Sequence, residues 1–139
     1  MKRWFVDTAY VLALASKRDS LNSRAEALKL QIKREEVELV TTEAVLLEIA
    51  TALRSPRYRT LAVASIEELQ RRALVLPLTP ILLHEAWEMY KRHTDKEWSW
   101  VDTISFVVMR REGMREALTS DHHFEQASFR ALLAPDQPS

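Results

Sequence analysis

The chain has 139 residues, of which 47% are hydrophobic and 29% charged, a composition typical of one globular domain. Its formal net charge is zero, so overall charge indicates neither nucleic acid nor a membrane as a partner. The absence of cysteine excludes disulfides and thiolate metal sites, and the single glycine excludes glycine-rich phosphate-binding loops. No apolar run approaches the ~20 residues of a membrane-spanning helix. We therefore expect no membrane segment and a cytoplasmic location.

Short apolar runs alternate with amphipathic segments along the whole chain. Thr41 or Thr42 and Ser99 are placed to cap helices, Pro80 suits a first helical turn, and Gly113 suits a helix end. The expected strands are 2–6, 38–40, 74–76, 117–119 and 130–133, and the expected helices are 8–16, 21–36, 42–53, 59–72, 80–93, 99–112 and a short one or a turn over 122–128. This alternation predicts an α/β fold with a mostly parallel sheet, in one domain over residues 1–134 with a tail over 135–139.

Four acidic residues interrupt or end apolar stretches of the sequence. They are Asp7, Glu48, Asp102 and Asp121. Carboxylates are rarely buried unless they are paired or bound to a cation. Asp7 and Asp121 come after predicted strands, and ligands of parallel sheets bind beyond the carboxyl ends of the strands. The pattern therefore predicts a single folded site that holds a metal ion.

Helix capping offers a structural explanation for three of these acids. Asp7 and Asp121 each precede a predicted helix, and Asp102 stands three residues after Ser99, as in a capping box. Capping and metal binding both remain open for each of the three at this point.

Glu48 has no such structural explanation. Its neighbours three and four positions away on the predicted helix are small or apolar, and none is a Lys or Arg that would neutralise it. Glu43 lies in the first turn of the same helix, where the helix dipole favours an acid, and we interpret it as structural. Glu48 is therefore the acid that most strongly indicates a functional site.

The segments around these acids resemble the PIN domain, and in particular VapC-type toxins of prokaryotic toxin–antitoxin pairs. The matching segments are 5–9, 47–48, 99–106 and 119–124. The resemblance covers essentially the whole chain, and segments 99–109 and 119–129 are its most specific parts. It implies a three-layer α/β/α sandwich and a Mg²⁺- or Mn²⁺-dependent endoribonuclease that cleaves single-stranded or structured RNA.

The resemblance also implies roles for individual residues. Asp7, Glu48, Asp102 and Asp121 fall on the acidic quartet of the family, as catalytic residues and metal ligands. Thr8, Ser99, Ser105 and Thr119 match small polar positions beside those acids. Mg²⁺ and Mn²⁺ are hard cations that prefer oxygen ligands, as carboxylates supply. We expect His122 and His123 to be exposed loop residues, and the pair formed by His123 and Phe124 to be structural.

An RNA substrate requires basic side chains around the acidic site. Arg54, Arg57 and Lys96 are the candidates, and Tyr58 or Trp98 could stack on a base. The structural alternative is that Arg54 and Arg57, and likewise Lys96, simply lie at solvated helix ends. The other tryptophans are expected in the core: Trp4, Trp87 and Trp100.

Amphipathic helices suggest surfaces for partner proteins. We expect the helices 21–36 and 59–72 to pack together as a hairpin arm with an apolar groove. The family likeness implies a homodimer and a small antitoxin that binds the active site. A non-catalytic PIN-like module that binds RNA or protein remains the alternative, and metal-dependent cleavage by the purified protein separates the two.

Overall fold

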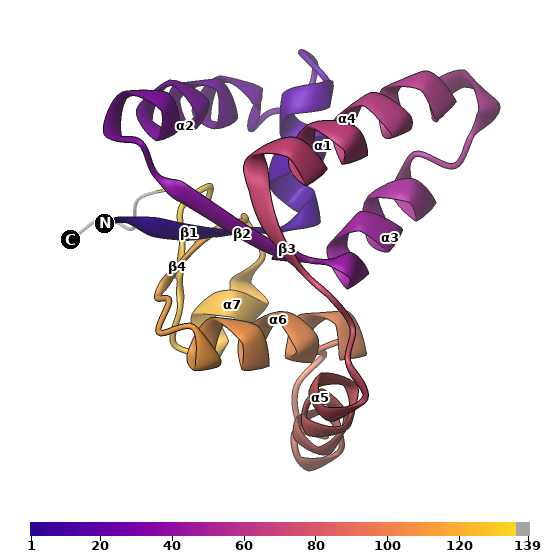
Figure 1. Ribbon diagram of the computed structural model, residues 1–139, viewed down its shortest axis with the longest axis vertical. Helices are drawn as coiled ribbons and strands as arrows, with labels where there is room; N and C mark the ends of the chain where they lie inside the picture. The colour runs from indigo at the N-terminus through magenta and orange to yellow at the C-terminus, as the bar shows by residue number, and fades with distance from the viewer. Residues whose placement is uncertain (136–139) are drawn as a thin grey trace.

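A computed structural model describes residues 1–135, which form a parallel sheet covered by helices on both sides (Figure 1). The strands are β1 (Arg3–Val6), β2 (Glu38–Thr42), β3 (Ala73–Leu76), β4 (Glu116–Leu118) and β5 (Arg130–Ala131). The helices are α1 (Thr8–Ala15), α2 (Asn22–Glu35), α3 (Glu43–Ala52), α4 (Arg59–Arg72), α5 (Pro80–Arg92), α6 (Trp100–Arg111) and α7 (His122–Gln126), with a 3-10 turn η1 (Pro56–Tyr58) between α3 and α4.

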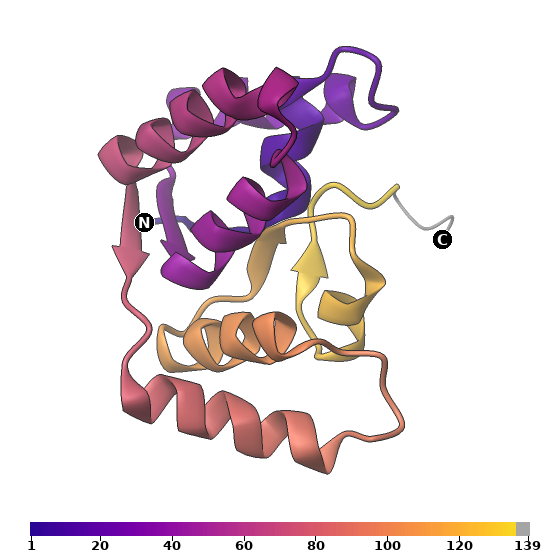
Figure 2. The same cartoon turned by 90° about the vertical axis from the view of Figure 1, so that its right-hand side faces the viewer.

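The five strands have the order β3-β2-β1-β4-β5, and every pairing between neighbours is parallel. Helices α1 to α4 lie on one side of the sheet and α5 to α7 on the other, as the two perpendicular views show (Figures 1 and 2). The α/β/α expectation is confirmed, and the sheet is wholly rather than mostly parallel. The chain moves from β1 to β2 on one side and later returns to β4 on the other, which makes the carboxyl end of β1 a topological switch point.

Strand β1 is almost entirely hydrophobic because it lies in the core of the domain. Trp4, Phe5 and Val6 are all buried because helices cover both faces of the central strand. Phe124 is fully buried and contacts Phe5 at 6.4 Å and Phe106 edge-on at 5.0 Å between ring centroids. These contacts fix α6 and α7 against the end of β1.

Local signals in the sequence set several helix boundaries. Thr42 caps α3 by accepting a hydrogen bond from the backbone N–H of Val45, and Pro80 is the first residue of α5. Gly113 has a φ of 65°, a left-handed conformation that favours glycine and ends the run of α6.

Three expectations about surfaces and the core were wrong. Trp4 is buried as expected, whereas Trp87 and Trp100 are 39% and 41% exposed and pack against each other at a tilted angle on the surface of α5 and α6. Trp98, a candidate for stacking on a base, is buried. Helices α2 and α4 do not form the expected hairpin: α2 packs mainly against α1 and α4 mainly against α3, so Leu69 is buried by the domain's own core.

Two further expectations concern the ends of the chain and membranes. Most of the predicted tail, residues 136–139, lies outside the described residues. In the described part of the chain, no helix has the length and apolar character needed to cross a membrane.

Candidate active site

Asp7 lies directly after β1, at the switch point of the sheet. It occupies the N-cap position of α1, yet its side chain makes no capping hydrogen bond. It is only 8% exposed, and its Oδ2 accepts a hydrogen bond from the hydroxyl of Thr119 at 2.7 Å. Thr119 follows β4, which pairs with β1 in parallel register, and this pairing brings the two residues together. The capping explanation therefore fails for Asp7.

Glu48 enters the same region from α3. The hydroxyl of Thr8, the first residue of α1, donates a hydrogen bond to Oε1 of Glu48 at 2.5 Å. Glu43, one turn earlier, instead accepts a hydrogen bond from the backbone N–H of Leu78 at 2.8 Å, in agreement with a structural role. Thr8 thus joins the end of β1 to the acid of α3.

Asp102 and Asp121 cap helices, as the structural explanation predicted. Asp102 and Ser99 form a reciprocal capping box at α6, with two hydrogen bonds of 3.0 Å. Asp121 caps α7 by accepting a hydrogen bond from the backbone N–H of His123 at 2.9 Å. Capping does not by itself exclude a metal-binding role, because each hydrogen bond occupies one lone pair of the carboxylate.

His123 was expected in an exposed loop, and this expectation was wrong. Its side chain is 16% exposed, and Nδ1 lies 3.2 Å from Oδ2 of Asp102 and 3.2 Å from Oδ1 of Asp121. His122 is exposed as expected, at 69%. The sequence signal that was missed is the position of His123 two residues after a helix-capping Asp and next to the buried Phe124.

The electrostatics connect all four acids. Burial is the main reason that the pKa of Asp7 is raised to about 7; the charges of Glu48 and Asp102 act in the same direction, and the hydrogen bond from Thr119 opposes them. Burial also raises the pKa of Asp102, and the nearby charge of Asp121 adds to that effect. The acids that the sequence placed far apart therefore share one local field.

The donor set fits a hard divalent cation. No ion pair within residues 1–135 joins any of the four acids to a Lys or Arg, so their negative charge is left for another cation to balance. The carboxylates supply oxygen atoms, which Mg²⁺ and Mn²⁺ prefer. Ligand atoms of Asp121, His122 and His123 also lie within 4.8 Å of one another. Ser105 is buried, but its hydroxyl has no hydrogen-bond partner among the described residues.

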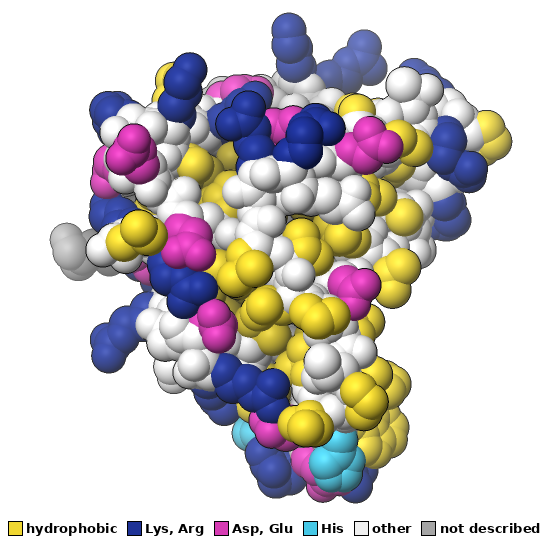
Figure 3. Space-filling model, viewed as in Figure 1, with side chains coloured by type: hydrophobic (Ala, Val, Ile, Leu, Met, Phe, Trp, Pro, Cys, Tyr) yellow, Lys and Arg dark blue, Asp and Glu magenta, His cyan; other side chains and the backbone are white. Residues whose placement is uncertain are grey.

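The candidate RNA-binding residues lie at exposed ends of helices. Arg54 follows α3 and donates to the backbone carbonyl of Thr51, and Arg57 lies over the ring of Tyr58 at 5.4 Å. Figure 3 shows Lys and Arg side chains at this outer end of α3 and α4. Lys96 is paired with Asp95 at 3.5 Å in the loop before α6. Of the two aromatic candidates, only Tyr58 is exposed, at 40%.

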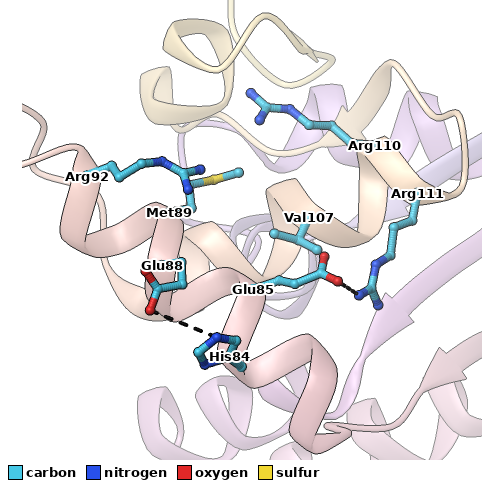
Figure 4. Close-up of a pocket in the computed structure, with 8 residues that line it drawn as sticks. All are labelled: His84, Glu85, Glu88, Met89, Arg92, Val107, Arg110 and Arg111. Atoms are coloured by element: carbon cyan, nitrogen blue, oxygen red, sulfur yellow. Dashed lines mark ion pairs between the residues drawn. The ribbon is translucent and has the colours of Figure 1, made fainter.

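A cavity on the outer side of the α5–α6 pair is separate from the acids. It is lined by His84, Glu85, Glu88, Met89, Arg92, Val107, Arg110 and Arg111 (Figure 4). Glu85 pairs with Arg111 at 2.5 Å and Glu88 with His84 at 4.0 Å. Because both of its acids are already paired with basic groups, this cavity is a poor candidate for the chemistry of the quartet.

A parallel α/β/α sandwich with acids at the switch point defines the class of protein. The family model of the PIN domain matches residues 4–130, and the chain belongs to the PIN-domain family.

Relatives with known names share most of the length of the chain. It is 34% identical over 126 residues to the 23S rRNA-specific endonuclease VapC20 of Mycobacterium tuberculosis, in both strain CDC 1551 / Oshkosh and strain ATCC 25618 / H37Rv, covering 90% of this chain and 94% of the relative. The crystal structure of Mycobacterium tuberculosis VapC20, described as a Sarcin-Ricin loop cleaving toxin, superimposes with a TM-score of 0.77 and 31% identity, over 90% of this chain and 95% of that one.

Proposed function

We propose that this protein is a divalent-metal-dependent endoribonuclease and the toxin of a toxin–antitoxin pair. The observation that carries the proposal is the buried Asp7 at the end of β1, which makes no capping hydrogen bond and shares its field with Glu48 and Asp102. Membership of the PIN family and likeness to a toxin that cleaves 23S rRNA support the same reaction class.

Asp7, Glu48, Asp102 and Asp121 are the proposed metal ligands and catalytic residues. A bound Mg²⁺ or Mn²⁺ would polarise the scissile phosphate and lower the pKa of an attacking water. The protein supplies orientation: Thr119 and Thr8 hold the carboxylates of Asp7 and Glu48 by short hydrogen bonds. Ser99 orients Asp102 through the capping box, so three of the four proposed supporting residues contact an acid directly.

We further propose that Arg54 and Arg57 contact the phosphates of the RNA. Arg54 lies just beyond the carboxyl end of α3, the helix that carries Glu48, and Arg57 is exposed beside Tyr58. Replacing either Arg by Gln should weaken RNA binding and reduce its salt dependence by about one counterion. Lys96 is the weaker candidate, because it already forms an ion pair with Asp95.

The proposed substrate is structured RNA, as for the VapC20 relative, and the proposed partners are a second copy of the chain and a small antitoxin. The exposed aromatic residues of α5 and α6 are suited to a protein interface. Light scattering that shows only a monomer at high concentration would contradict the dimer.

Expression without the antitoxin should slow growth of a bacterial host, and normal growth with cleavage-competent protein present would contradict the toxin role. A cytoplasmic location follows from the proposed substrate and stays a prediction.

Incubation of the purified protein with ribosomal RNA tests the enzymatic proposal. Cleavage should require Mg²⁺ or Mn²⁺ and stop when EDTA is added. A protein that binds RNA under the same conditions without cutting it, at any metal concentration, would instead support the non-catalytic alternative.

A further inference from the structure

His123 occupies a position between two acids of the proposed metal site. Its Nδ1 is 3.2 Å from Oδ2 of Asp102, on α6, and 3.2 Å from Oδ1 of Asp121, before α7. Ionised carboxylates only accept hydrogen bonds, so Nδ1 is the atom that carries the hydrogen toward them. The Nδ1 group hydrogen-bonds Asp102 and lies equally close to Asp121, so one ring nitrogen contacts two acids from different elements of the fold.

The backbone and the core determine where this ring lies. The backbone N–H of His123 donates to Oδ1 of Asp121, the same oxygen that its Nδ1 contacts. The next residue, Phe124, is fully buried against Phe106 and Phe5, which anchors α7 to α6 and β1. The packing of Phe124 therefore holds the ring in place independently of Asp102, and the backbone contact fixes it relative to Asp121.

The two acids have a physical need for such a contact. Two carboxylates facing one site repel each other, and no Lys or Arg of residues 1–135 forms an ion pair with either. Oδ2 of Asp102 also accepts a hydrogen bond from the backbone N–H of Ser99. Ser99 and His123 therefore both contact the same oxygen of that carboxylate.

We propose that His123 is a positioning residue that holds Asp102 and Asp121 at the mutual spacing a shared divalent cation requires. This inference rests on the proposed function, since it presupposes that the two acids bind the metal. His123 acts through Nδ1 and not as a ligand of the metal itself. Groups that hydrogen-bond metal ligands typically contribute roughly 10- to 100-fold to metal affinity.

A pair of amide variants isolates the Nδ1 contact. The amide of His123→Asn can place an N–H near the position of Nδ1, whereas that of His123→Gln reaches the position of Nε2. Titration calorimetry of each metal-free protein with MnCl₂ and with MgCl₂ measures the dissociation constants. We expect His123→Gln to raise both constants about tenfold and His123→Asn to raise them about threefold or less. His84→Gln, which makes the same substitution at an exposed histidine of the separate α5–α6 cavity, is the matched control and should bind as wild type does.

Three results would overturn the proposal. One is wild-type affinity in His123→Gln, and another is an equal loss in His123→Asn and His123→Gln. The third is a loss confined to Mn²⁺, which would make His123 a nitrogen ligand, because Mn²⁺ accepts imidazole more readily than Mg²⁺. The proposed function fails separately: it fails if wild-type protein binds neither cation or if Asp102→Asn does not weaken binding.

Melting of the metal-free variants provides a second readout. If His123 acts on Asp102, the effects of His123→Gln and Asp102→Asn on the unfolding free energy should be non-additive in a double-mutant cycle. Additive effects would show that His123 stabilises the fold without acting on that acid, which contradicts the proposal.

Discussion

The hydroxyl of Thr119 joins Asp7 to Asp121. It donates to Oδ2 of Asp7 at 2.7 Å and accepts from the backbone N–H of Asp121 at 3.0 Å, so one side chain links the loops that follow β1 and β4. Thr119 is fully buried, and its methyl group lies within the domain. The acid of the first strand and the acid of the fourth are thereby held together by a residue that carries no charge.

Thr119→Val should therefore destabilise the protein although it preserves the shape of the side chain. The substitution removes a hydrogen bond to a carboxylate and leaves the N–H of Asp121 without its partner, an expected loss of about 1–3 kcal/mol. Urea denaturation at pH 8 measures it. Thr119→Ser keeps the hydroxyl and should lose less; equal stability of wild type and Thr119→Val would contradict the role assigned to this hydroxyl.

The raised pKa of Asp7 predicts an unusual pH dependence of stability. The raised pKa means that the folded protein keeps the proton of Asp7 up to about pH 7, whereas the unfolded chain releases it near the ordinary pKa of 3.8. Between these values the folded state holds more protons, so metal-free protein should lose stability as pH rises from about 4 to 7, by at most about 4 kcal/mol from this group.

Asp7→Asn should remove this part of the pH dependence. Melting curves in EDTA between pH 5 and 8 compare the variant with wild type. A slope that is identical in the two proteins would show that Asp7 does not titrate in this range.

Divalent cations should stabilise the folded protein, because the four acids are brought together only in the folded state. At ~100 times the dissociation constant, binding adds about 2.7 kcal/mol to the unfolding free energy. Differential scanning calorimetry with millimolar MnCl₂ should therefore show a higher Tm than in EDTA. MgCl₂ is the second divalent salt to compare, and NaCl at equal ionic strength is the control for ionic strength. An unchanged Tm in MnCl₂ would count against the metal site.

Two neighbouring tryptophans should respond differently to truncation. Trp98 is buried, meets Phe106 edge-on and donates to Gln126, so Trp98→Ala should cost about 3–5 kcal/mol. Trp100 is 41% exposed, packs against Trp87 and donates a long hydrogen bond to the carbonyl of Leu83, so Trp100→Ala should cost about 1 kcal/mol. Chemical denaturation of both variants checks this order, and a larger loss in Trp100→Ala would contradict it.

The same two tryptophans show what the sequence could not reveal. Helix periodicity and capping signals located α6 to within one or two residues, and the acids at strand ends indicated the site. Exposure of Trp100 and burial of Trp98 depend on how the loop before α6 packs against α7 and α5, a tertiary relationship that no local pattern encodes. For His123 the local signal, two residues after Asp121, was overlooked, but its contact with Asp102, 21 residues away on another helix, is a tertiary relationship of the same kind.

The most direct test of the central claim is a charge-only substitution of Asp7 and Asp102. The side-chain oxygen of Asn can still accept the hydrogen bond from the backbone N–H of Ser99, so Asp102→Asn can retain the capping box while it removes the negative charge. Metal-dependent cleavage of RNA is measured for wild type, Asp7→Asn and Asp102→Asn, with circular dichroism to verify folding and Glu43→Gln as the control outside the site. We predict that both Asn variants fold and lose cleavage while Glu43→Gln keeps most of it. Cleavage by Asp7→Asn and Asp102→Asn at the wild-type rate would contradict the assignment of these acids to the active site.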